Sequence, residues 1–399
     1  MTYKKVWQSS LLFLITTTFV LGQTKPNQIV QKIQEAATAQ YTNAVNSYKD
    51  SARYPRSTRP NGSLYSVDCR DWCSGFFPGS LWLIYNLTND AFYEKAARKW
   101  SIALEKEQFD KSTHDLGFMM YNSFGNGYRL TKDENYKRII LQSANSLATR
   151  FNAKASVIRS WDFGPWQFPV IIDNMMNLEM LVEVSKLSGN KRYKEIAILH
   201  ANHDMQHHFR KDYSSYHVVD YDTTNGNPIK KQTNQGYNDE SAWARGQAWG
   251  LYGFTTMYRY TKDKKYLDHA EHIAEFILTN PNYPKDGIPY WDFNDPKIPD
   301  TYRDASAAAI IASALLELKN FVNKEKSSQY FKQAELILSN LSTPTYLATQ
   351  GNGNFILQHC VGNWPKGKAT GEIDAAINYG DYYLLEAALR YQEVTKHRK

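Results

Sequence analysis

Cysteine is scarce in this sequence. Only three cysteines occur in 399 residues, at positions 69, 73 and 360. An odd number argues against a disulfide framework, and Cys69 and Cys73 lack the second pair or the histidine spacing of a zinc site. The count allows one bridge, but a structural role or free thiols are favoured. No metal and no other cofactor is expected.

Long apolar runs and blocks of basic residues are also missing. No stretch after the first 22 residues approaches the length of a transmembrane helix, so no membrane anchor is expected. The net charge is +7, and the first 22 residues hold two lysines and no acidic residue, so the remaining chain carries +5. This mild excess is compatible with a polyanionic substrate. Nucleic-acid binding would require a Lys/Arg block, which is absent.

The first residues carry a targeting pattern. Two lysines precede an apolar run from Leu11 to Leu21, and the small Gly22 follows. A basic flank, a short apolar core and a small residue are typical of a secretory signal peptide, and no cysteine follows Gly22 to carry a lipid anchor. We therefore expect residues 1–22 to be removed on export to the periplasm or the medium, and residues 23–399 to form one domain.

A recurring turn organises the rest of the chain. In five places a polar residue stands three positions before a tyrosine, after an apolar run and before an amphipathic one. Ser, Asp and Asn accept a backbone N–H at the start of a helix, so each of these residues is a predicted N-cap. The five pairs are Asp90 and Tyr93, Asp133 and Tyr136, Asn190 and Tyr193, Asp263 and Tyr266, and Ser327 and Tyr330.

Apolar helices before these turns and amphipathic helices after them form hairpins. The apolar helices are predicted at about 78–87, 116–130, 173–187, 243–260 and 305–318, with a sixth at about 374–390. The sixth has no helix after it and the N-terminal helix, about 27–48, has no partner before it, so these two would close a ring. No credible run of alternating strands appears. The sequence thus predicts an all-α fold, an (α/α)6 barrel of six helical hairpins.

The segments that lead into the inner helices should meet at one mouth of such a barrel, and they are rich in acids and aromatic rings. Asp115 and Asp173 are the best pair, because glycoside chemistry needs one carboxyl to give a proton and one to activate water. Asp173 follows the apolar run 168–172, so burial is expected to raise its pKa. Alternatively, Asp173 and Asp304 could each be only an N-cap.

Histidines offer two further candidates. His217 could be a general acid or base, a substrate ligand or a structural residue. The run 200–208, HANHDMQHH, looks like a metal site. On an outer helix, however, its residues would fall on several faces and away from the mouth, so no metal is expected there.

The segment from Gly236 to Gly250, GYNDESAWARGQAWG, places two indoles, a guanidinium and an amide among small residues. A guanidinium binds a carboxylate bidentately and an indole stacks on a sugar ring, so Arg245 and Trp249 are predicted to hold a sugar acid. The alternative is a buried helix in which the arginine is merely paired.

At these residues the chain resembles the unsaturated glucuronyl hydrolases, family 88 of the glycoside hydrolases. The likeness rests on DWCSGFFPGSLW, HDLGF, IIDNMMNLEML, the isolated His217 and QGYNDESAWARGQAWGLYG, in the family's order. The resemblance implies the same barrel, with Asp173 as general acid and base and Asp115 as the second essential carboxylate. It implies that the other pocket residues bind an unsaturated uronic acid: Trp72, His114, Trp161 (preferred to Trp166), His217, Gln235, Arg245 and Trp249.

The chemistry that the resemblance implies is a hydration. The substrate would be an oligosaccharide whose non-reducing end carries the 4,5-unsaturated uronic acid left by a polysaccharide lyase. Asp173 would protonate C4, water would add at C5, and the resulting hemiketal would open and release the next sugar. Neither a metal nor a cofactor takes part.

The identity of the adjoining sugar stays open. Some family members carry a Ser-x-Ser-x-Lys pattern associated with sulfate, whereas this chain has VGNWPKGKATGE at 361–372. Lys366 and Lys368 could meet a sulfate or could be solvated. Glycosaminoglycan and ulvan fragments are both compatible with this loop.

Two rival interpretations are an unsaturated rhamnogalacturonyl hydrolase, which acts on pectin fragments, and a non-catalytic carbohydrate-binding protein. The RGQAW motif argues against the rhamnogalacturonyl hydrolase. The presence of both Asp115 and Asp173 argues against the second, because binding an anion does not need two carboxylates.

Overall fold

The helices of the barrel begin where the turns predict. The computed structural model describes residues 28–396. Asp90, Asp133, Asn190 and Asp263 each accept the backbone N–H two residues on, at the starts of α3 (Ala91–Ile102), α5 (Glu134–Ala148), α7 (Lys191–His207) and α9 (Lys264–Thr279). The fifth predicted cap is wrong. Asn323 accepts the N–H of Lys326 and starts α11 (Lys324–Leu341) one turn earlier, so Ser327 lies inside the helix.

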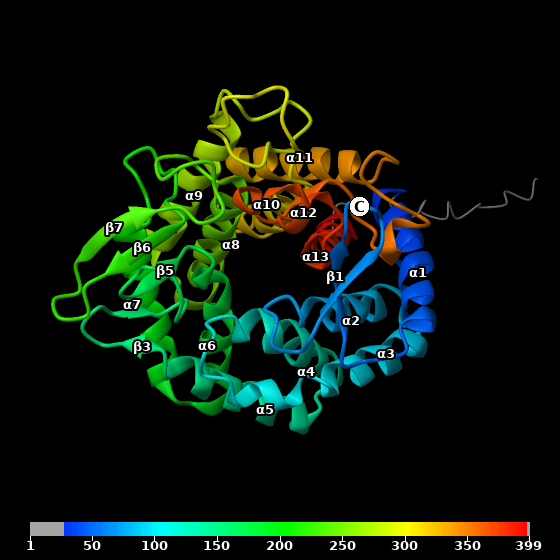
Figure 1. The fold of residues 1–399 in the computed structure, drawn as a ribbon, viewed down its shortest axis with the longest axis horizontal. Coiled ribbons are helices and arrows are strands. Elements are labelled where there is room, and N and C mark those ends of the chain that lie inside the picture. The colour runs from blue at the N-terminus through cyan, green and yellow to red at the C-terminus, as the bar shows by residue number, and fades with distance from the viewer. Residues whose placement is uncertain (1–27, 397–399) are drawn as a thin grey trace, which may run out of the picture.

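Inner and outer helices alternate around a ring (Figure 1). The outer ring holds α1 (Gln28–Ser47), α3, α5, α7, α9 and α11. The inner ring holds α2 (Phe76–Thr88), the π-helix η2 (Gly117–Gly125) running into α4 (Asn126–Thr131), α6 (Asn174–Ser188), α8 (Ala244–Thr261), α10 (Ala305–Leu318) and α13 (Asn378–Lys396). Every residue of α10 is buried, whereas α3 buries one side only. α1 packs against α13 and α2 and closes the ring, which confirms the (α/α)6 barrel.

Short strands, which the sequence did not predict, decorate the loops before the inner helices. Antiparallel pairs join β1 (Tyr54–Thr58) with β2 (Leu64–Val67), β3 (Phe151–Asn152) with β4 (Val157–Ile158), and β8 (Cys360–Val361) with β9 (Ile373–Ala375). β5 (Pro169–Ile171), β6 (Val218–Tyr221) and β7 (Pro228–Gln232) form a three-stranded sheet. Strands of two to five residues are too short to leave a period in the sequence.

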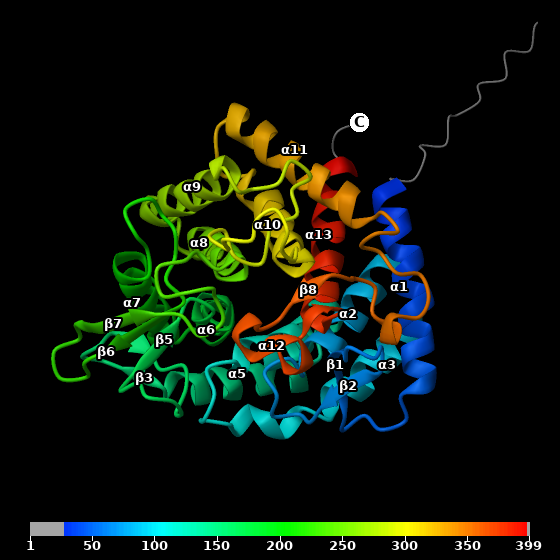
Figure 2. The same ribbon diagram turned by 45° about the horizontal axis from the view of Figure 1, so that its top comes forward.

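The mouth loops also bring the two ends of the described chain together. Figure 2 shows α12 (Gly367–Thr370) and β8 close to β1 and β2, and Ser57 of β1 bridges Ile377. The remaining short elements are the 3-10 turns η1 (Glu105–Phe109), η3 (Asn352–Asn354) and η4 (Trp364–Lys366). One mouth of the barrel is therefore covered by loops from both ends of the chain.

Cys69, Cys73 and Cys360 are buried free thiols. Within residues 28–396, no helix is long and apolar enough to cross a membrane. The predicted signal peptide lies outside the described residues.

Candidate active site

A cavity of about 570 Å³ opens at the mouth where the inner helices begin. The structure brings most of the predicted site residues into its wall: Trp72, His114, Asp115, Trp161, Asp173, Gln235 and Arg245. His217 and Trp249 stand behind this wall, next to Asp173. All nine predicted residues thus meet at one place, although they come from four different connections and from helix α8.

Asp173 lies two residues after the end of β5 and at the N-cap position of α6, yet its side chain makes no capping hydrogen bond. Asp304 does cap its helix, α10, by accepting the N–H groups of Ser306 and Ala307. The cap interpretation is therefore correct for Asp304 and wrong for Asp173, whose carboxyl is left to face the cavity. Burial raises the pKa of Asp173 to about 6, although the charge of Arg245 and the indole N–H of Trp249 lower it.

Asp115 lies next to a neutral histidine, His114, whose unprotonated nitrogen faces the carboxyl. His114 Nδ1 lies 2.9 Å from the carbonyl oxygen of Ser160, which only accepts, so Nδ1 bears the proton. Burial lowers the pKa of His114 to about 3, so the ring is neutral and Nε2 bears no proton. Nε2 lies 3.2 Å from Asp115 Oδ1. A carboxylate there would face a lone pair, whereas a carboxylic acid can donate.

The electrostatics of Asp115 agree with that geometry. Burial and the negative charge of Asp173 raise the pKa of Asp115 to about 8. Together, the two carboxyls hold one proton between about pH 6 and pH 8. In the unliganded pair that proton belongs to Asp115. The raised pKa predicted for Asp173 is confirmed, but Asp115 has the higher value.

His217 precedes β6 and touches Asp173. Its Nδ1 accepts the backbone N–H groups of Asn234 and Gln235 at 3.0 and 3.1 Å. Burial and the charge of Arg245 lower the pKa of His217 to about 3, so the neutral ring carries its proton on Nε2. Nε2 lies 3.8 Å from Asp173 Oδ2. His217 therefore presents a fixed N–H to Asp173 rather than titrating at neutral pH.

Arg245 differs from its predicted role. Its Nη1 donates to Asp304 and to the carbonyl of Val361, and its Nη2 donates to the carbonyl of Gly362. Only Nε lacks a partner within the described residues. The two terminal nitrogens of the Arg245 guanidinium thus point into the protein and away from the cavity, as in the alternative in which the arginine is merely paired. What reaches the site is its charge, which lowers the pKa of Asp173.

Aromatic rings form the sides of the cavity. Trp72 stacks on Tyr379 with ring centroids 5.2 Å apart, and Trp161 stacks on Phe163 at 5.2 Å. Trp161 lines the cavity, as preferred, while the indole N–H of Trp166 donates to Gln232. Gln235 donates its side-chain N–H to the carbonyl of Gly362, so its amide is already oriented.

The wall of this cavity also contains polar residues that the sequence did not predict. Arg56, on β1, donates to both oxygens of Asp71 and to both of Glu372, at 2.7 to 2.9 Å. Glu372 lies 316 positions away, and no local pattern connects the two residues. Lys366 also lines this cavity, whereas Lys368 lies near the ring of Tyr302.

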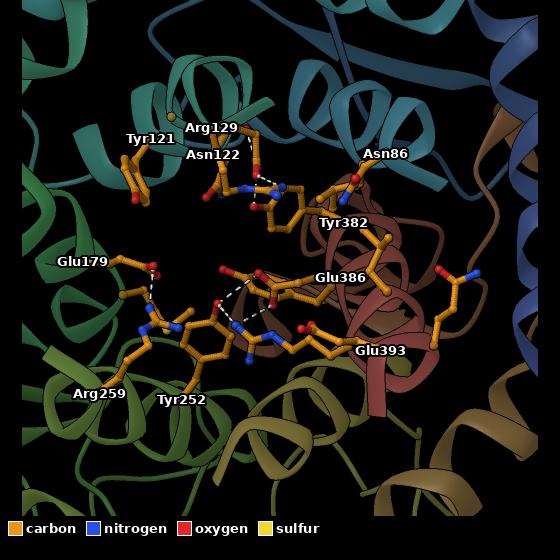
Figure 3. A pocket seen from close by; sticks show the side chains of 18 of the residues that line it. Asn86, Tyr121, Asn122, Arg129, Glu179, Tyr252, Arg259, Tyr382, Glu386 and Glu393 are labelled. Atoms are coloured by element: carbon orange, nitrogen blue, oxygen red, sulfur yellow. Dashed lines mark hydrogen bonds and ion pairs between the residues drawn. The ribbon is translucent and has the colours of Figure 1, made fainter. Parts of the chain in front are cut away.

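A second cavity, of about 450 Å³, opens at the opposite mouth of the barrel (Figure 3). Two of the acids in its wall are paired with arginines: Glu179 with Arg259 at 2.5 Å, and Glu386 with Arg390 at 3.7 Å. The rings of Phe118, Trp249 and Tyr383, in tilted and edge-on contact, lie between the two cavities. The titrating pair of carboxyls belongs to the first cavity.

The histidine run of α7 is the remaining candidate. Its residues fall on more than one face, as predicted: His200, Asp204 and the C-cap His208 are fully buried, whereas His203 and His207 are partly exposed. Successive positions four apart share a helix face. Within residues 28–396, no group of three His, Cys, Asp or Glu side chains is arranged to hold a metal ion.

Comparison with known proteins places this site in a family. The model of Glycosyl Hydrolase Family 88 matches residues 46–394. An unsaturated glucuronyl hydrolase of Formosa agariphila is 46% identical over 94% of each chain, and one of a Bacillus species is 33% identical over 85% of this chain and 91% of its own. A crystal structure of an unsaturated glucuronyl hydrolase specific for heparin is 49% identical, with a TM-score of 0.90 over 93% of this chain and 99% of that one.

Proposed function

The chain belongs to glycosyl hydrolase family 88, and we propose that it removes a 4,5-unsaturated uronic acid from the non-reducing end of oligosaccharides made by polysaccharide lyases. The observation that carries this proposal is the pair Asp115 and Asp173, two largely buried carboxyls in the wall of one cavity, and burial raises the pKa of each. Such a pair can give a proton and take one in the same step.

The proposed reaction adds water across the C4=C5 double bond. Asp173 gives a proton to C4, and the positive charge that develops at C5 and the ring oxygen is met by water, whose proton returns to the carboxyl pair. The product is a hemiketal at C5, which opens to a ketone and releases the next sugar as an alcohol. The proton that Asp115 holds in the unliganded protein supplies the pair. An anionic substrate close to Asp173 raises its pKa further and so favours transfer of that proton to Asp173.

The pocket residues have separate proposed roles. The faces of Trp72 and Trp161 bind the sugar rings. His217 and Trp249 direct N–H groups at Asp173 and hold its orientation, and the charges of Arg245 and Arg56 attract the uronate. His114 fixes the proton of Asp115, and Gln235 holds the backbone around Gly362.

Sulfated glycosaminoglycan fragments are the proposed substrate class, with heparin lyase products first. Two observations support this choice: the 49% identity with the heparin-specific relative, and the basic side chains of Arg70 and Lys366 in the cavity wall. Ulvan fragments are the alternative. We also propose that the enzyme is exported to the periplasm or the medium, on the strength of the signal pattern in residues 1–22.

The experiment is an assay of purified protein on unsaturated disaccharides from heparin, chondroitin, ulvan and pectin lyases, followed by loss of the ultraviolet absorbance of the double bond. We expect cleavage of the heparin product and a loss of activity on the order of 10³-fold in Asp173→Asn. Asp300→Asn, a change on an exposed loop, is the matched control and should keep full activity. Full activity in folded Asp173→Asn would refute the mechanism, and cleavage of pectin fragments alone would refute the substrate class.

A further inference from the structure

The buried face of α7 connects the histidine run with the site. His200, Asp204 and His208 are each 0% exposed, and Asp204 lies 3.5 Å from His200 Nε2 and 3.1 Å from His208 Nδ1. A carboxylate is thus enclosed by two imidazoles on an outer helix. The reaction proposed above makes no use of these groups.

Hydrogen bonds at the outer ring nitrogens decide where the protons are. His200 Nδ1 accepts the backbone N–H of Ile158 at 2.9 Å, so His200 is neutral and its proton faces Asp204. His208 Nε2 lies 3.1 Å from the carbonyl oxygen of Val170, which only accepts, so this nitrogen also bears a proton. Its Nδ1 faces a carboxylate, and only a second proton makes that contact attractive. The geometry at both ring nitrogens therefore favours a doubly protonated His208.

Asp204 is the anion of this pair. Burial alone would raise the pKa of Asp204, but the neighbouring imidazoles of His208 and His200 bring it well below its usual range. A buried cation and a buried anion in contact are costly unless both are held in place. The surroundings meet that condition, because both histidines are anchored to backbone groups.

His208 is tied to both segments that carry the site. Through Nε2 it holds Val170 in β5, three residues before Asp173. Through its own carbonyl it accepts the N–H of Tyr216, which stands directly before His217, at 2.7 Å. β5 and β6 then pair, with Val170 opposite Val219. His208 therefore links β5 to the segment before His217, through its ring on one side and its backbone carbonyl on the other.

We propose that the buried Asp204–His208 ion pair is a positioning element for the reaction: it fixes the strands that carry Asp173 and His217, and its cation stabilises the ionised form of Asp173. The inference rests on the proposed function of Asp173. His208 touches no substrate. It acts through Val170 and Tyr216, and through its charge.

The effect of the Asp204–His208 pair on the pKa of Asp173 depends on the other titratable groups around them. Asp173 is faced by Asp115, His217, Arg245 and Trp249. The ion pair is faced by His200, His207, His217 and His269. The charge of His208 lowers the pKa of Asp173. Loss of this charge should therefore raise that pKa.

The test is Asp204→Asn, which keeps the shape of the site and removes the charge. The amide oxygen can accept from His200 Nε2, the amide nitrogen can donate to a neutral His208, and the contact with Val170 survives. We expect a folded enzyme with a several-fold lower kcat, whose acidic limb of kcat/KM lies about half a pH unit higher than in the wild type. His203→Gln, on the same helix and outside the network, is the control and should leave the profile unchanged.

Nitrogen-15 NMR of the histidine rings supplies an independent readout. In wild type at neutral pH, His208 should show the two protonated nitrogens of an imidazolium, and in Asp204→Asn only one. A neutral His208 in wild type, or an unchanged pH profile in folded Asp204→Asn, would overturn the proposal. Failure of the proposed function would look different, because wild type itself would then not cleave the unsaturated disaccharides.

Discussion

Asp115→Asn should make the protein more stable while abolishing most of its activity. In the folded wild type, His114 Nε2 and the hydroxyl of Thr113 surround a protonated Asp115. An asparagine has the same shape, can donate to His114 through its nitrogen and can accept from Thr113 through its oxygen. The variant thus reproduces the neutral form of Asp115 without needing a proton from solvent.

The size of the effect follows from the pKa of Asp115, which is about 8 in the folded protein against 3.8 for an ordinary aspartate. The folded state takes up one proton between these values, so wild-type stability falls as pH rises, by about 1.4 kcal/mol per pH unit. The asparagine variant lacks this loss. The free energy of unfolding of Asp115→Asn should exceed that of wild type by almost nothing at pH 4 and by at most about 4 kcal/mol at pH 7. The difference should stop growing above pH 8, at no more than about 6 kcal/mol.

Urea unfolding at pH 5, 7 and 9, followed by tryptophan fluorescence, measures this difference directly. The gain in free energy of unfolding should increase from pH 5 to pH 7, and the rate of cleavage should fall on the order of 10³-fold. Asp300→Asn, on an exposed loop, should show no pH-dependent gain. A loss of stability in Asp115→Asn that is the same at all three pH values would show that Asp115 is ionised in the folded protein, and would refute the shared proton.

Three further predictions concern the site and its export. The pH profile of kcat/KM should be a bell, falling below about pH 6, where Asp173 becomes protonated, and above about pH 8, where Asp115 loses its proton; a rate independent of pH across this range would contradict the pair. Arg56→Lys, which cannot bind both Asp71 and Glu372 bidentately, should raise KM about tenfold with little change in kcat, and a change in kcat alone would contradict a binding role. Mass spectrometry of the exported protein should find Gln23 as its first residue, and an intact N-terminus on exported protein would contradict the signal peptide.

The sequence was a good guide to the barrel because helices obey local rules. The apolar run predicted at 305–318 coincides with α10 (Ala305–Leu318), and four of five predicted caps accept the expected N–H. Most of the site residues were found for the same reason, since they stand in the loops before the inner helices or, like Arg245 and Trp249, in the first turns of one. The ring then brings these segments together.

Interactions between segments that are far apart in the chain could not be predicted from the sequence. Arg56 and Glu372 meet only because α13 returns beside α2. The proton on Asp115 depends on the carbonyl of Ser160, which sets the tautomer of His114. Arg245 turns its fork inward because the β8 loop offers two carbonyl groups. These are outcomes of packing, and no local pattern encodes them.

The hydration itself can be tested most directly by running the reaction in D2O and examining the products by NMR. Addition of water across the double bond predicts one deuterium at C4 of the released uronic acid, which opens to a ketone, with loss of the ultraviolet absorbance as cleavage proceeds. Direct cleavage at the anomeric carbon would leave the double bond intact and put no deuterium at C4. That result would contradict the role assigned to Asp173 and Asp115.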